Sequence, residues 1–129
     1  MKAHKKIELQ DAPVHRIVTD TAWIQGGVVS PQAFQPRPVD KGELSLLDSG
    51  KDAPAAHAEW QAAWGERLPG QACLSRKVSD FTGLGVEVYE SGSKKLPSHA
   101  HADMKDAADV DTVAILLAED CPVWRPPAA

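Results

Sequence analysis

Three prolines between residues 28 and 42 set the strongest constraint on what this chain can fold into. Pro31, Pro36 and Pro38 lack a backbone N–H donor, so this stretch cannot form a regular helix. We predict an ordered loop over 28–42 that carries Phe34 inward, and a loop of this length is typical of a functional or a mobile segment. Regular elements are therefore expected in the segments on either side.

Length and composition favour one domain. With 129 residues, 43% of them hydrophobic, the chain can bury about two-thirds of its unfolded surface in a single core. The two separated cysteines, Cys73 and Cys121, fit neither a zinc ribbon nor a secreted disulfide framework. We expect a flexible lead-in over residues 1–12, which ends at Pro13, and a single α+β domain over 13–129.

Charge and hydropathy exclude several classes of partner. The formal net charge is −4, and residues 101–129 carry all of it. Acidic surface repels phosphate, and the only basic cluster is Lys2, Lys5 and Lys6, so we expect no nucleic-acid binding. No apolar run approaches the ~18 residues that cross a bilayer, and residues 7–11 interrupt any signal peptide. We therefore predict a cytoplasmic protein without membrane contact.

Hydrophobic patterning predicts a small, mainly antiparallel sheet covered by two helices. Alternating or β-branched runs predict strands over residues 14–18, 43–48, 71–77 and 86–90. Asp52 can cap a helix over 55–68, in which Trp60 and Trp64 lie on one face and pack on the sheet. Together these elements indicate an α+β fold.

The remaining segments are shorter or ambiguous. Residues 105–117 fit a helix, and a buried strand over 112–117 is the alternative; we favour the helix because of its alanines and its acidic first turn. A short helix is expected over 19–24, ended by the glycine pair 26–27. Residues 123–125 are expected to pack as a terminal arm.

The sharpest local motif is His99-Ala100-His101-Ala102-Asp103. In an extended segment alternate side chains point the same way, so His99, His101 and Asp103 could converge on a metal such as zinc. The motif resembles the H-x-H-x-D core of metallo-β-lactamase-type hydrolases, although Met104 stands where those enzymes have a further His and their fold needs a longer chain. The alternative is a polar turn in which one His bonds the backbone.

A second arrangement combines His15 and Arg16 on the first strand with Ser45 and with Glu87 or Glu90 on later strands. An NAD-using transferase needs a group that binds the dinucleotide, a hydroxyl near the nicotinamide, and a carboxylate that stabilises an oxocarbenium-like sugar. The order of these residues is compatible with those roles. The structural alternative is that Arg16 pairs with an acidic neighbour, Ser45 faces solvent and Glu87 alternates outward.

The segment after the first strand resembles the small ADP-ribosyltransferase-like folds. In those folds a His or Arg near the end of the first strand precedes a short helix and a Gly, as His15, Arg16, Trp23 and Gly26 do here. The resemblance implies NAD as the cofactor. The chain departs from it in having no clear S-T-S strand and no E-x-E motif at Glu87.

Motifs spread along the chain are similar to a group of short uncharacterised bacterial proteins. They are His15–Val18, Trp23, Gly27, Ala33–Phe34, Leu44–Leu46, and Pro97 with His99–Ala100. This likeness implies the context of a bacterial or phage conflict system and no particular activity.

We favour a non-catalytic module that binds another protein. The acidic C-terminal end, the proline-rich loop and a terminal tryptophan suit contact with a partner, and Phe34 and Trp124 are the candidate binding residues. An ADP-ribosyltransferase-like enzyme using NAD, and a metal-binding protein, remain the alternatives. The sequence leaves open whether the chain is catalytic.

Overall fold

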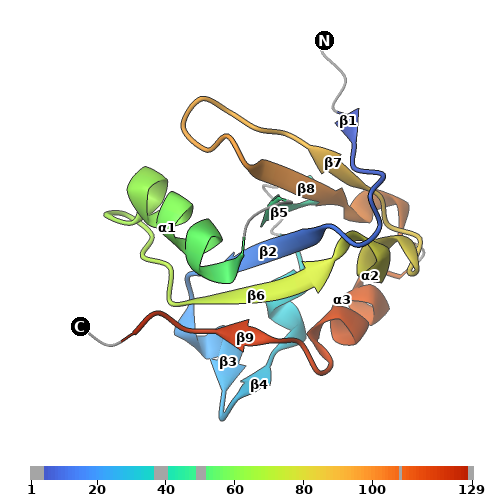
Figure 1. Cartoon of the computed structure of the whole chain (residues 1–129). Helices are drawn as coiled ribbons and strands as arrows, with labels where there is room; N and C mark the ends of the chain where they lie inside the picture. The colour runs from blue at the N-terminus through green and yellow to red at the C-terminus, as the bar shows by residue number, and fades with distance from the viewer. Residues whose placement is uncertain (1–4, 37–40, 49–51, 108, 128–129) are drawn as a thin grey trace.

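The computed structural model describes residues 5–36, 41–48, 52–107 and 109–127, which form one α+β unit (Figure 1). Its centre is a seven-stranded antiparallel sheet. The strands, in spatial order, are β1 (Lys5–Lys6), β7 (Val88–Glu90), β8 (His99–Asp103), β5 (Glu43–Leu47), β2 (Pro13–Val18), β6 (Ala72–Lys77) and β9 (Val123–Trp124). The α+β architecture expected from the sequence is confirmed.

The helices lie on opposite faces of the sheet, with α1 on one face and α2 and α3 on the other. The helical segments are η1 (Thr21–Trp23), η2 (Pro31–Phe34), α1 (Ala53–Trp64), α2 (Val78–Thr82), η4 (Met104–Asp106) and α3 (Val110–Ala118), where η denotes a 3₁₀ turn. None of the helices in the described part of the chain is long and apolar enough to cross a membrane.

Local sequence explains where the two main helices begin. The Asp52 side chain accepts a hydrogen bond from the Ala55 amide (2.8 Å) at the start of α1, and Asp109 does the same for the Thr112 amide (3.2 Å) at the start of α3. Such caps satisfy amides that have no partner within the helix. The preference for a helix within residues 105–117 is confirmed, with a later start than expected.

Alternation along the strands divides the core into two parts. On one face, side chains such as Val14, Leu44 and Leu74 pack with α2, α3 and η2 in the main core. On the opposite face, Ile17 and Leu47 belong to a smaller cluster that α1 covers. The expected packing of the α1 tryptophans on the sheet is confirmed, because Trp60 and Trp64 both contact this smaller cluster.

Residues 5–12 differ from the flexible lead-in that the sequence suggested. Strand β1 pairs with β7, the Ile7 amide donates to the Val88 carbonyl (2.8 Å), and both Ile7 and Ala12 are buried. This pairing joins segments some eighty positions apart, which a local pattern does not reveal. Lys5 and Lys6 therefore form one edge of the sheet.

The sequence predicted that the glycine pair at 26–27 ends a short helix, and this prediction is wrong. The pair forms the turn of a separate hairpin made of β3 (Ile24–Gln25) and β4 (Val28–Val29). Gly26 and Gly27 have φ angles of 59° and 78°, and two successive positive φ angles are what a tight hairpin turn of matching twist requires. Glycine adopts positive φ angles more readily than other residues, so the two successive glycines fix the position of the hairpin turn.

The two outer strands of the sheet are each two residues long. At one edge β1 presents Lys5 and Lys6. At the other edge β9, which was expected only as a terminal arm, pairs with β6 and is flanked by Pro122 and Pro126.

We expect Phe34→Ala to lower the free energy of unfolding by about 3–5 kcal/mol, because it removes a large side chain from the main core. Phe34 is only 1% exposed. Urea denaturation measures the change, and Leu9→Ala, at a side chain that is 69% exposed, serves as the control and should shift stability by less than about 0.5 kcal/mol. Unchanged stability of Phe34→Ala would contradict the core assignment.

Candidate functional site

Serine and histidine side chains gather on the sheet face that α1 partly covers. Nδ1 of His99 shares a hydrogen bond with the Ser91 hydroxyl (2.7 Å), and Nε2 shares another with the Ser45 hydroxyl (3.1 Å). On the neighbouring strands, Nδ1 of His15 bonds the Ser75 hydroxyl (2.9 Å). We call this set, together with His101, the serine–histidine face.

The space beside this face decides what it can do. Arg16, Ser45, Trp60 and His99, with three neighbouring aliphatic residues, line a cavity of about 20 Å³. Such a volume holds about one water molecule. The serine–histidine hydrogen bonds beside it form a polar network that links neighbouring strands.

The three residues of the predicted metal motif lie on one strand and on one face of it. The segment is strand β8, so the alternative of a polar turn is wrong. Asp103 accepts a hydrogen bond from the Lys105 amide (3.2 Å) and lies 3.9 Å from Lys105 Nζ, while the ring of His101 stacks on Tyr89 with centroids 5.5 Å apart. Within the described ranges, no three His, Cys, Asp or Glu residues are arranged to hold a metal ion.

Arg16 and Ser45 of the predicted transferase site both line the cavity of about 20 Å³, but neither Glu87 nor Glu90 does. Arg16 shares its face of β2 with the main core, whereas the side chain of Ser45 lies on the opposite face of the sheet with His99. The Arg16 guanidinium donates to the backbone carbonyls of Ala33 (2.9 Å) and Ser45 (3.0 Å) and lies 5.4 Å from the centroid of the Trp23 ring. These contacts join β2 to β5, η1 and η2.

The candidate carboxylates lie apart from Ser45 as well. Glu87 is half exposed near the sheet edge, with its carboxylate 3.8 Å from Lys6 Nζ. Glu90, the last residue of β7, is exposed and has the opposite orientation in the alternation of side chains. The expected outward position of Glu87 is found here, beside the buried Val86 and Val88.

Neither candidate binding residue forms an exposed patch. Phe34 lies in the main core, so its predicted inward orientation is confirmed. A buried side chain does not suit the binding role that was suggested for it. Trp124 is half buried on β9, where it packs against the smaller cluster with its ring 5.2 Å from that of His57.

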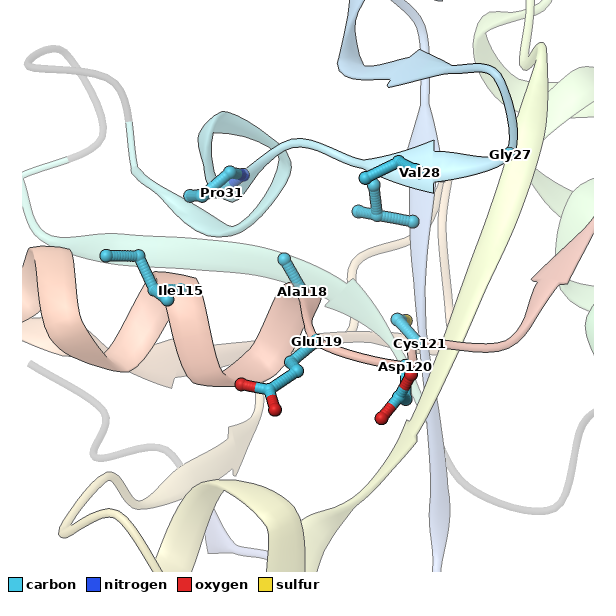
Figure 2. A pocket seen from close by; sticks show the side chains of 9 residues that line it. Gly27, Val28, Pro31, Ile115, Ala118, Glu119, Asp120 and Cys121 are labelled. Carbon is cyan, nitrogen blue, oxygen red and sulfur yellow. The ribbon is translucent and has the colours of Figure 1, made fainter.

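An open groove of about 400 Å³ lies between the β3–β4 hairpin and the C-terminal end of α3 (Figure 2). Its lining residues are Gly27, Val28, Val29, Pro31, Ile115, Ala118, Glu119, Asp120 and Cys121. Two of its aliphatic side chains are strongly exposed, with Val28 at 71% and Ile115 at 51%. Figure 2 shows Val28 on the hairpin side and Ile115 on the α3 side, with the carboxylates of Glu119 and Asp120 beside the end of α3 and directed away from the hairpin.

The sequence analysis did not find this groove. It is formed by segments about ninety residues apart, and neither of them carries a motif. The acidic C-terminal end and the proline-rich loop each contribute residues to it, but the sequence pointed to Phe34 and Trp124, which do not line it.

Comparison of the chain with protein-family models, curated proteins and solved structures found no match in any of the three.

We expect a double-mutant cycle of Ser45→Ala and His99→Ala to give a coupling of about 1 kcal/mol in the free energy of unfolding, since the two side chains share a hydrogen bond. Urea denaturation of the four proteins measures it. Near-zero coupling would show that this hydrogen bond does not hold β5 and β8 together.

The two cysteines should differ in reactivity. Burial raises the pKa of Cys73 to about 12 and raises that of Cys121 as well, although Arg76 opposes the second shift. Cys73 is fully buried and Cys121 lines the groove. Because the thiolate reacts, we expect a maleimide to label Cys121 slowly near neutral pH and faster as pH rises.

Cys73 should react only after denaturation, and Cys121→Ser is the control that removes the native-state labelling. Mass spectrometry of the labelled peptides reports both rates. Equal labelling of the two thiols in the native protein would contradict their placement.

Proposed function

We propose that this chain is a non-catalytic protein-binding module and that the groove between the β3–β4 hairpin and α3 is its binding surface. The observation that carries the proposal is the exposure of Val28 and Ile115 on the two walls of one hollow. Single exposed aliphatic residues are normal on a protein surface, but a pair that faces a shared groove offers a docking site.

The free energy gained by burying apolar side chains supports a binding role for the groove over a catalytic role for the serine–histidine face. Complete burial of a valine or isoleucine side chain contributes about 1.5–3 kcal/mol, and the groove offers two such side chains together with Pro31 and Ala118. The serine–histidine face has a cavity of only about 20 Å³. Of these two hollows, the groove is the one that can admit part of another molecule.

The alternatives stay predictions of the sequence. A transferase would need Arg16, Ser45 and Glu87 around one bound NAD, and a zinc protein would need His99 and His101 free to coordinate. The contacts described above favour neither arrangement. A place in a bacterial or phage conflict system also stays a prediction.

We expect a partner captured from a lysate of the native host to be lost, at least about tenfold, from the groove variants Val28→Asp and Ile115→Asp, because each places a charge in an apolar contact. Quantitative mass spectrometry of proteins bound to the immobilised full chain measures the loss. Leu68→Asp is the matched control, since Leu68 is 48% exposed and lies outside the groove.

All four proteins should unfold at similar temperatures, because the substituted side chains are exposed. Equal capture by the wild type and both groove variants, or capture of no protein, would contradict the proposal.

A further inference from the structure

We infer that the groove takes a short, extended segment of a partner protein in which an aliphatic side chain lies next to a lysine or arginine. This inference rests on the proposed function and adds the chemistry of the partner. It follows from two properties of the groove, its apolar walls and the negative charge at one end.

The apolar walls define the first part of the partner. Val28 and Pro31 lie on the hairpin side, and Ile115 and Ala118 lie on the α3 side (Figure 2). These four side chains offer no charged group, so a polar side chain placed among them would lose hydration without a matching partner. An aliphatic side chain fits this part of the groove.

The charge at one end defines the second part. Glu119 and Asp120 directly follow α3, where the helix dipole is also negative, and the last turn of α3 contains no basic residue. The nearby Arg76 donates to the backbone carbonyls of Leu117 and Glu119 and lies 4.0 Å from the carboxylate of Asp80. Because Arg76 already bonds the last carbonyls of α3, the negative charge offered to a partner cation is that of the Glu119 and Asp120 carboxylates.

The backbone at Asp120 fixes this charge at the rim. Asp120 has a φ angle of 52°, in the left-handed region that most side chains avoid and glycine adopts readily. An aspartate is tolerated there better than a bulky residue, and asparagine is tolerated similarly. Asparagine at this position can therefore remove the charge while it keeps the turn.

The carboxylates of Glu119 and Asp120 also allow the groove to discriminate between basic and acidic partner segments. A segment with acidic residues beside its aliphatic side chain would be repelled by Glu119 and Asp120, and so would a phosphate backbone. An uncharged segment would gain only the apolar contact. The preference for an adjacent cation is thus a property that can be measured separately from binding itself.

The test is a selection of a random peptide library, displayed on phage, against the full-length chain, with removal of clones that also bind Ile115→Asp. We expect the enriched peptides to share an aliphatic residue next to Lys or Arg. A synthetic peptide of the enriched sequence should bind the wild type and Leu68→Asp equally, and should lose binding to Ile115→Asp.

The charge is tested with the double variant Glu119→Gln, Asp120→Asn. We expect it to bind the same peptide about tenfold more weakly, with a smaller dependence on salt, because the two carboxylates that attract the basic residue of the peptide are replaced by amides. Its unfolding temperature should match that of the wild type. The peptide should also slow maleimide labelling of Cys121, which lines the groove.

The outcomes distinguish the inference from the function on which it rests. Peptides that require Ile115 but carry no basic residue, or that bind the double variant unchanged, would overturn the partner chemistry and leave the groove as a binding surface. Failure to enrich any peptide that depends on Ile115 would overturn both.

Discussion

The arrangement of the groove depends on the hydrogen bonds of the Arg16 guanidinium. From the centre of the sheet it donates to the Ala33 carbonyl in η2 and to the Ser45 carbonyl in β5, and it packs on the Trp23 ring in η1. Hydrogen bonds from a charged donor are stronger than neutral ones. The two 3₁₀ turns η1 and η2 precede and follow the β3–β4 hairpin in the chain, so Arg16 attaches the hairpin to the sheet.

Arg76 plays the corresponding part for the other wall. It lies on the neighbouring strand β6, opposite Val14 and on the same face of the sheet as Arg16, and it holds the carbonyls of Leu117 and Glu119 at the end of α3. Each wall of the groove is thus attached to one of two paired strands. The position of each wall therefore depends on the position of these two strands.

Much of the fold follows from local patterns. The alternation of residues 14–18 and 43–48 predicts strands β2 and β5, and Asp52 with the following proline predicts the start of α1. The same two-residue period correctly places His99, His101 and Asp103 on one face of β8. Short-range rules succeed here because the deciding interactions lie within a few residues of one another.

The candidate site depends on contacts that no local pattern contains. The pairing of β5 with β8 brings Ser45 beside His99, and the docking of η2 on α3 brings Val28 opposite Ile115. Both result from the register and packing of distant segments. Residues 26–27 show the same limit, since a glycine pair suits both a helix end and a hairpin turn, and only the hydrogen bonds of Ile24 and Gln25 with β4 decide between them.

The short outer strands also affect how this molecule behaves beside copies of itself. A sheet edge recruits further strands through its unpaired amides and carbonyls, and lysines, prolines and short edge strands all hinder such growth. Strand β1 carries two lysines, and prolines flank β9. Growth of cross-β fibrils from the native sheet is therefore disfavoured. At high protein concentration, self-association should occur through the apolar groove rather than through the edges of the sheet.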